Sequence, residues 1–133
     1  MPKTTRINTS ILALLLAAIL AGCASAGGGM PKEMSVAQAK QQVEQGAFLL
    51  DVRQPEEWNE AHVPGATLIP LGELESRLAE VPKDKPVVVM CRSGNRSQEG
   101  RDILLRNGFS QVTSMAGGIK DWAANGFPTI AGP

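Results

Sequence analysis

The segment CRSGNRS, residues 91–97, holds a cysteine between two arginines. It follows the apolar run VVVM and precedes a segment with helical periodicity. Backbone N–H groups in a tight loop, the positive end of a helix dipole and the charges of Arg92 and Arg96 all favour a thiolate over a thiol. The same groups form a cradle for an anion that binds or reacts at the sulfur. We therefore predict that Cys91 is a catalytic nucleophile.

The rest of this loop is the predicted substrate-binding set, which comprises Arg92, Ser93, Gly94, Asn95, Arg96 and Ser97. Gly94 is suited to a backbone angle that a residue with a Cβ would resist. Ser97 is suited to capping the helix that follows. Two simpler interpretations stay open here: a buried, inert cysteine, and arginines that stand by chance at a helix N-terminus, where they oppose the dipole.

The other cysteine, Cys23, ends a segment typical of a signal peptide. Lys3 and Arg6 precede an apolar run of eleven residues, Ile11 to Ala21, which is too short for the roughly 20 residues of a membrane-spanning helix. The sequence LAGC, residues 20–23, resembles the lipobox of bacterial lipoproteins, which is cut before the cysteine that is then acylated. An accidental cysteine near an ordinary secretory cleavage site is the alternative. We expect residues 1–22 to be removed.

Residues 23–34 are expected to form a lipidated N-terminus and a flexible tether, because Ala24 to Lys32 are small, glycine-rich and without hydrophobic periodicity. Several acyl chains on Cys23 would hold the protein on a membrane. We expect an exported protein, lipid-anchored to a bacterial cell envelope on its periplasmic face, and Ala24 resembles an outer-membrane sorting signal. Acylation would leave Cys91 without a disulfide partner, and an unpaired thiol in an oxidising compartment favours a chemical role.

Composition narrows the classes of partner. The 133 residues carry 13 basic and 13 acidic side chains, so no global field favours nucleic acid. One domain is expected at this length, and we expect a monomer. A single histidine and one free thiol cannot assemble the usual metal-ligand sets, so neither a metal nor another cofactor is predicted.

Helix-like and strand-like segments alternate from Ser35 onward. Apolar or β-branched runs predict four strands, at residues 48–52, 67–70, 87–90 and 111–115, and helices are predicted at 35–45, from Pro55, at 71–81, at 97–107 and through Trp122. Strands that are apolar on both faces predict a parallel sheet covered by helices, in one α/β domain over residues 35–133. Ligands bind at the carboxyl ends of such strands, where Cys91 stands.

Four motifs resemble a single rhodanese domain over about residues 35–130: DVRQPEEW (51–58), AHVPGATLIP (61–70), CRSGNRS (91–97) and GGIKDW (117–122). The resemblance implies a three-layer α/β domain with a central parallel sheet flanked by helices. It also implies a sulfurtransferase, in which the Cys91 thiolate takes a sulfane sulfur from a small anionic donor such as thiosulfate. The resulting persulfide is passed to a thiol, to cyanide or to a protein acceptor.

The resemblance extends to residues outside the loop. Asp51 and Arg53 match the charged pair of the family's DVR motif, which implies that they support the loop; a surface ion pair at a strand end is the alternative. His62 matches the histidine of the G-H-I-P-G-A motif, although Ala61 replaces its first glycine, and we interpret His62 as a structural hydrogen-bonding residue rather than a base. Trp58 and Trp122 are interpreted as packing residues.

Two other functions compete with sulfur transfer. A cysteine-loop phosphatase or arsenate reductase places five residues between its cysteine and the phosphate-binding arginine, whereas four separate Cys91 from Arg96. The shorter loop favours a persulfide over a tetrahedral oxyanion. A membrane-tethered persulfide carrier or binding module with little small-molecule turnover stays open, because the surface that selects an acceptor is not encoded in these motifs.

Overall fold

Five short strands form one parallel sheet in the computed structural model, which describes residues 29–133. They are β1 (Glu33–Met34), β2 (Phe48–Asp51), β3 (Thr67–Leu68), β4 (Val87–Met90) and β5 (Val112–Met115), and their order across the sheet is β1-β5-β4-β2-β3. The four residues of β4 are all buried, three of them β-branched valines that favour the extended backbone. The predicted parallel sheet is confirmed.

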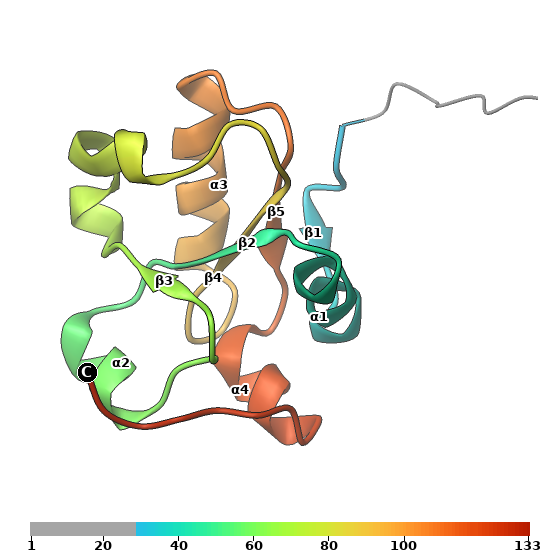
Figure 1. Ribbon diagram of the computed structural model, residues 1–133, viewed down its shortest axis with the longest axis vertical. Helices are drawn as coiled ribbons and strands as arrows, with labels where there is room; N and C mark the ends of the chain where they lie inside the picture. The colour runs from blue at the N-terminus through green and yellow to red at the C-terminus, as the bar shows by residue number, and fades with distance from the viewer. Residues whose placement is uncertain (1–28) are drawn as a thin grey trace, which may run out of the picture.

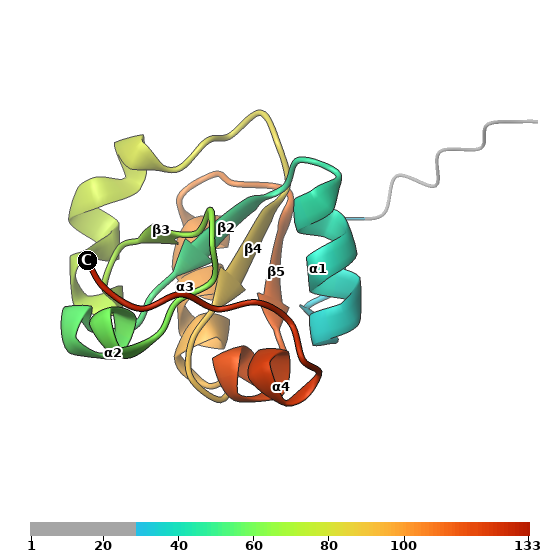
Figure 2. The same ribbon diagram turned by 60° about the horizontal axis from the view of Figure 1, so that its bottom comes forward.

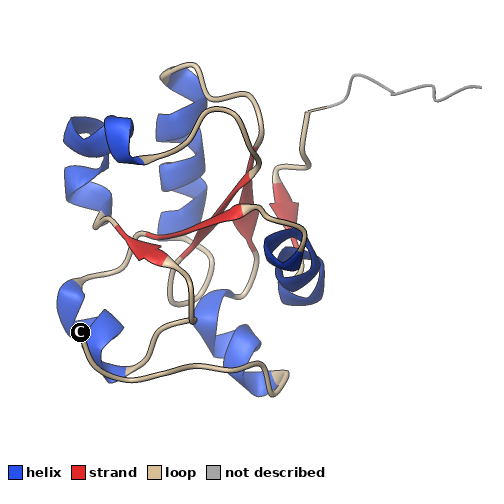
Figure 3. Cartoon of the chain, in the orientation of Figure 1, coloured by secondary structure: helices blue, strands red, loops and turns tan. Residues whose placement is uncertain are grey.

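Helices cover both faces of this sheet, as the resemblance implied. One face carries α3 (Arg96–Arg106) and the 3₁₀ helix η1 (Leu71–Glu80), and the other carries α1 (Val36–Glu44) and α4 (Gly118–Ala124). Figures 1 and 3 show the strands between these groups of helices. The short helix α2 (Pro55–Glu60) has no buried residue and lies near the carboxyl end of the sheet.

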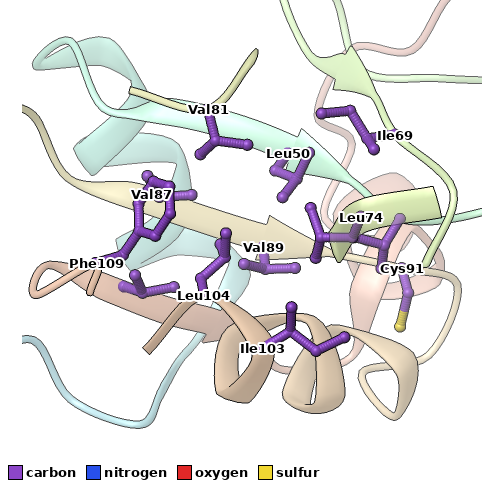
Figure 4. Close-up of a cluster of buried hydrophobic side chains, with 12 residues drawn as sticks. Leu50, Ile69, Leu74, Val81, Val87, Val89, Cys91, Ile103, Leu104 and Phe109 are labelled. Carbon is purple, nitrogen blue, oxygen red and sulfur yellow. The ribbon is translucent and has the colours of Figure 1, made fainter. Parts of the chain in front are cut away.

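Alternation along β4 separates two hydrophobic cores. Val87 and Val89 face the core that α3 and η1 close, while Val88 and Met90 face the core under α1 and α4. Cys91 continues the first set, and Figure 4 shows it at the edge of that cluster, beyond the end of β4. The end of the strand therefore directs the sulfur toward the α3 side of the sheet.

The segment 71–80 differs from the expected helix. It is a 3₁₀ helix interrupted at Arg77, whose φ of −122° is not helical. Leu71 and Leu74 are three residues apart and both pack into the core, which fits three residues per turn. Helix α1 begins close to its predicted position, and Ser35 and Gln38 form a capping box at its start.

Strand β1 was not expected. Glu33 and Met34 pair with the end of β5 and form one edge of the sheet, within the range expected to be a tether. A two-residue strand shows too little alternation to be recognised as a pattern. The proposed signal peptide (1–22), Cys23 and the first part of the tether lie outside the described residues. Within residues 29–133, no helix has the length and apolar character that crossing a membrane requires.

Candidate active site

Cys91 lies at the carboxyl end of β4, where the chain turns into α3, and only 1% of it is exposed. Figure 2 shows α2, α4 and the C-terminal segment gathered around this end of the sheet. This is the position predicted from the sequence. In parallel α/β sheets, ligands bind to the loops at the carboxyl ends of the strands. Cys91 packs against the hydrophobic cluster, but a backbone N–H also donates to its sulfur, which favours a reactive thiol over an inert core cysteine.

Hydrogen-bond donors converge on the sulfur. The backbone N–H of Gly94 donates to Sγ of Cys91 at 3.1 Å, and Oγ of Ser97 lies 3.5 Å from the same atom. Burial raises the pKa of the Cys91 thiol, but the hydrogen bonds from Ser97, Gly94 and Ser93 outweigh it and hold that pKa below its ordinary value. These hydrogen bonds therefore favour the thiolate more than the surroundings of an ordinary cysteine do.

Gly94 has the conformation that was predicted for it. Its φ is +100°, in the left-handed region that a residue with a Cβ rarely adopts. A Cβ at Gly94 would also lie 3.0 Å from the backbone nitrogen of Gly117. The turn that aims the Gly94 amide at the sulfur thus needs a glycine for its backbone angle and for the space around it.

Helix α4 holds the loop from outside. The N–H of Ile119 donates to the carbonyl of Cys91 at 2.9 Å, and the N–H of Lys120 donates to the carbonyl of Arg92 at 3.2 Å. In a trans peptide the C=O and the N–H of the next residue point in opposite directions. When α4 binds a loop carbonyl from outside, the N–H of the next residue therefore points toward the interior of the loop. For the Arg92 carbonyl this amide belongs to Ser93, one of the groups that lower the pKa of Cys91.

The two loop arginines lie in different surroundings. Arg96 donates from its two terminal nitrogens to the carboxylate of Glu57, at 2.7 and 2.8 Å. This hydrogen bond lowers the pKa of Glu57 from 4.5 to about 2, against the opposing effect of burial. Arg92 is exposed and makes no side-chain hydrogen bond or ion pair with the residues that the structure describes. Arg92 is thus the loop arginine free to meet an incoming anion.

Asp51 and Arg53 form a buried ion pair, so the alternative of a surface pair is wrong. Their side chains are 0% and 4% exposed, and Nη2 of Arg53 donates to Oδ2 of Asp51 at 2.7 Å. Arg53 also donates to the carbonyls of Ala61 and Glu57, at 2.8 and 3.3 Å. The pair therefore connects the end of β2 to α2, the helix that carries the Glu57 carboxylate.

Ser97 does not cap α3, contrary to the prediction. The helix begins at Arg96, and its N-cap residue Asn95 makes no side-chain capping bond. The hydroxyl of Ser97 is instead buried between the sulfur of Cys91 and the hydroxyl of Ser114, which donates to it at 2.8 Å. Ser97 thus lies on the face of α3 that packs against the sheet, where it meets Ser114 of β5.

Ser114 is the site residue that sequence reasoning missed. It lies in β5 and is completely buried. The available signal was the adjacent hydroxyl residues Thr113 and Ser114 in the run QVTSM, a strand predicted to be covered on both faces. Of the other predicted loop residues, Ser93 and Asn95 are exposed.

His62 and the tryptophans have structural roles, as interpreted from the sequence. The ring of His62 stacks on Trp58 with centroids 3.8 Å apart, and its Nδ1 lies 3.0 Å from the Trp58 carbonyl oxygen. Trp122 is 3% exposed, and its Nε1 donates to the carbonyl of Pro128. No hydrogen bond within the described residues connects these side chains to Cys91.

A pocket of about 260 Å³ opens beside the loop. Its charged lining residues are three cations and two carboxylates: Arg53, Arg92, Lys120, Glu57 and Glu60. The described residues contain no cluster of three metal-ligating side chains. The cations in the pocket wall thus outnumber the carboxylates by one.

The fold and the site together define a parallel α/β domain with a cysteine loop at the carboxyl end of its central strand β4. The family model described as Rhodanese-like domain matches residues 35–125. The chain therefore belongs to the rhodanese-like family and carries one rhodanese-like sulfurtransferase domain.

Three known proteins illustrate the similarity. A sulfurtransferase of Allochromatium vinosum is 38% identical over 84 residues, which cover 63% of this chain and 78% of that protein. The thiosulfate sulfurtransferase GlpE of Pseudomonas syringae pv. syringae is 37% identical over 91 residues, 68% of this chain and 86% of that protein. The crystal structure of a rhodanese-related protein from Thermoplasma volcanium matches with a TM-score of 0.69 and 27% identity, over 75% of this chain and 98% of that one.

Proposed function

We propose that the protein transfers sulfane sulfur from thiosulfate, or a donor of similar size and charge, to a small nucleophilic acceptor through a persulfide on Cys91. The observation that carries this proposal is the convergence of the Gly94 N–H and the Ser97 hydroxyl on a buried sulfur whose pKa is lowered. The similarity to a protein named thiosulfate sulfurtransferase supports the choice of donor.

The reaction has two balanced steps. In the first, the Cys91 thiolate attacks the outer sulfur of thiosulfate, the S–S bond of the donor breaks, and its electron pair leaves with sulfite. In the second, a thiolate or cyanide attacks the outer sulfur of the persulfide, and Cys91 leaves as the thiolate. The charge stays on sulfur near the loop throughout, where fixed N–H and O–H donors stabilise it without reorganisation.

The arginines favour this donor over phosphate. Because Arg96 is already paired with Glu57, it offers no clamp for the oxygens of a tetrahedral dianion. Arg92 and Lys120, which line the pocket, remain to hold the sulfonate-like end of thiosulfate. The pairing of Arg96 and the availability of Arg92 and Lys120 both favour thiosulfate over phosphate. The four-residue spacing between Cys91 and Arg96 favours the same donor.

Incubation of the purified protein with thiosulfate, followed by intact mass measurement, tests the first step. We expect the mass of one added sulfur atom, its loss on addition of cyanide, and release of thiocyanate. Cys91→Ser should show none of these, whereas Cys23→Ser, which keeps the loop intact, should behave as the unsubstituted protein.

The rival functions predict different results. A persulfide that forms but passes to neither cyanide nor a small thiol would indicate a carrier that serves a protein acceptor. Absence of any persulfide, together with Cys91-dependent hydrolysis of an aryl phosphate, would overturn the sulfurtransferase proposal in favour of a phosphatase.

We also propose that the protein is exported and anchored to the cell envelope by lipid on Cys23, with the domain on the periplasmic face. The supporting features are the apolar segment Ile11 to Ala21 and the sequence LAGC at residues 20–23. Cys23→Ser should move the protein out of the membrane fraction, and Ser25→Ala, which keeps the cysteine, should not. Unchanged membrane association of Cys23→Ser would remove the basis for the anchor.

A further inference from the structure

A chain of three buried side chains leads from the sheet to the sulfur. Oγ of Ser114 in β5 donates to Oγ of Ser97 in α3 at 2.8 Å, and Oγ of Ser97 lies 3.5 Å from Sγ of Cys91. All three residues are at most 1% exposed. Water is thus excluded from the contacts, and the two hydroxyl hydrogens must find acceptors within the protein.

The direction of the hydrogen bonds follows from counting these acceptors. Ser97 is the hydrogen-bond partner of the Ser114 hydroxyl within the described residues, so the hydrogen of Ser114 points at Ser97. The remaining contact of the Ser97 hydroxyl is with Sγ of Cys91, which donates to Ser97 as a thiol and accepts from it as a thiolate. If the sulfur is protonated, its hydrogen and the hydrogen of Ser97 both lie between Sγ and Oγ, and only one of them can form the hydrogen bond. If it is a thiolate, both hydroxyls are satisfied, and a hydroxyl left unsatisfied in a buried site is costly.

We propose that Ser114 is a positioning residue for sulfur transfer, which acts through Ser97 by directing the Ser97 hydroxyl hydrogen at the Cys91 sulfur. This inference rests on the proposed function and adds a residue to it. Ser114 touches neither sulfur nor substrate. Its donated hydrogen bond also polarises the Ser97 hydroxyl, which makes Ser97 a better donor.

The relay, which runs from the Ser114 hydroxyl through the Ser97 hydroxyl to the Cys91 sulfur, acts at both steps of the reaction. Before the first step it increases the fraction of Cys91 present as the attacking thiolate. In the second step Cys91 is the leaving group, and a donor held at Sγ stabilises the negative charge that returns to it as the S–S bond of the persulfide breaks. Loss of the relay should therefore slow the discharge of the persulfide as well as its formation.

Thr113, next to Ser114 in β5, provides a matched control. It is also completely buried, but its hydroxyl has no hydrogen-bond partner in the described structure. Successive residues of a strand face opposite sides of the sheet, so Thr113 points away from Ser97. Thr113→Val removes a buried hydroxyl from the same strand without touching the relay.

The test is a titration of the Cys91 thiolate by its ultraviolet absorbance, with Cys91→Ser as the reference that subtracts any other thiol. We expect Ser114→Ala to raise the pKa of Cys91 and Thr113→Val to leave it unchanged. The rate constant of thiocyanate formation at a pH below the Cys91 pKa should fall roughly two- to tenfold in Ser114→Ala, the range of one net hydrogen bond. An unchanged titration in Ser114→Ala, or an equal shift in Thr113→Val, would overturn the proposal.

A double-mutant cycle with Ser97→Ala tests whether Ser114 acts through Ser97. In the Ser97→Ala background, Ser114→Ala should cause no further change in the titration. An equal effect in both backgrounds would show that Ser114 acts independently and would contradict the relay. The titration needs no sulfur donor, so its result is separate from that of the persulfide experiment: a protein that forms no persulfide can still show the relay, and the reverse also holds.

Discussion

Glu57 and Arg96 join through two hydrogen bonds of 2.7 and 2.8 Å across 39 residues of sequence. The contact links α2 to the first residue of α3, so the end of the Cys91 loop is tied to the helix that follows β2. It also neutralises Arg96, which leaves Arg92 as the loop arginine without an acidic partner in the described structure.

The ion pair predicts a pH-dependent contribution to stability. Glu57 has a folded-state pKa of about 2 against an ordinary value of 4.5, so the pair stabilises the fold above pH 4.5 and the contribution is lost as the pH falls toward 2. Because both side chains are partly exposed, Glu57→Gln should lower the free energy of unfolding by only about 1 kcal/mol at pH 7. Glu56→Gln, an exposed neighbour in the same helix turn, should have little effect. A gap between wild type and Glu57→Gln that persists at pH 2 would contradict this cause.

The lowered pKa of Cys91 predicts a characteristic pH profile of alkylation. Iodoacetamide reacts with the thiolate, so its rate constant at Cys91 should level off at a lower pH than it does with free cysteine, and should fall as the pH drops through the Cys91 pKa. The same profile in the urea-unfolded protein should return to that of free cysteine. A profile that is the same in the folded and unfolded protein would mean that the loop amides do not hold a thiolate.

Removal of the Asp51 charge should be strongly destabilising. Asp51→Asn leaves Arg53 buried without its counter-charge, and breaking a buried pair from one side costs about 3–5 kcal/mol in the free energy of unfolding. Glu44→Gln, which breaks the exposed pair between Lys40 and Glu44, should cost less than about 0.5 kcal/mol. Urea unfolding of both variants measures the difference, and equal losses would argue against burial as its cause.

Gly118 should not tolerate a side chain. Its φ is +59°, and a Cβ there would lie 2.4 Å from the backbone carbonyls of Arg92 and Cys91, which cannot move without displacing the loop. We expect Gly118→Ala to lower stability and to raise the pKa of Cys91. Gly126→Ala carries only the backbone penalty of about 1 kcal/mol, because nothing lies within 4 Å of a Cβ at that position. A normal Cys91 titration in Gly118→Ala would show that α4 does not shape the loop.

Arg92 should determine the affinity for the donor. If Arg92 makes a charge-assisted hydrogen bond to thiosulfate, Arg92→Ala should raise KM about tenfold or more, and added salt should weaken binding to wild type more than to the variant. Arg106→Ala, at the exposed far end of α3, provides the control. An unchanged KM would assign donor binding to other groups in the pocket, such as Lys120.

Local patterns predicted most of the architecture. The β-branched run of β4 and the start of α1 depend on neighbours within a few residues, and both elements were predicted close to their observed positions. The partner of Arg96 and the hydroxyl that meets Ser97 were not, because Glu57 and Ser114 approach the loop only after the chain has folded. The location of Cys91 could be predicted because it directly follows β4. The roles of the other loop side chains could not, because they depend on tertiary contacts.

The hold of α4 on the Cys91 loop has a consequence for biosynthesis. The amides of Ile119 and Lys120 that bind the loop carbonyls are made after Cys91, in the last helix of the chain. A growing chain that has released β4 and α3 but not α4 lacks these contacts, so its thiol titrates closer to an ordinary cysteine. We therefore expect the Cys91 thiol to gain its lowered pKa only when α4 has joined the domain.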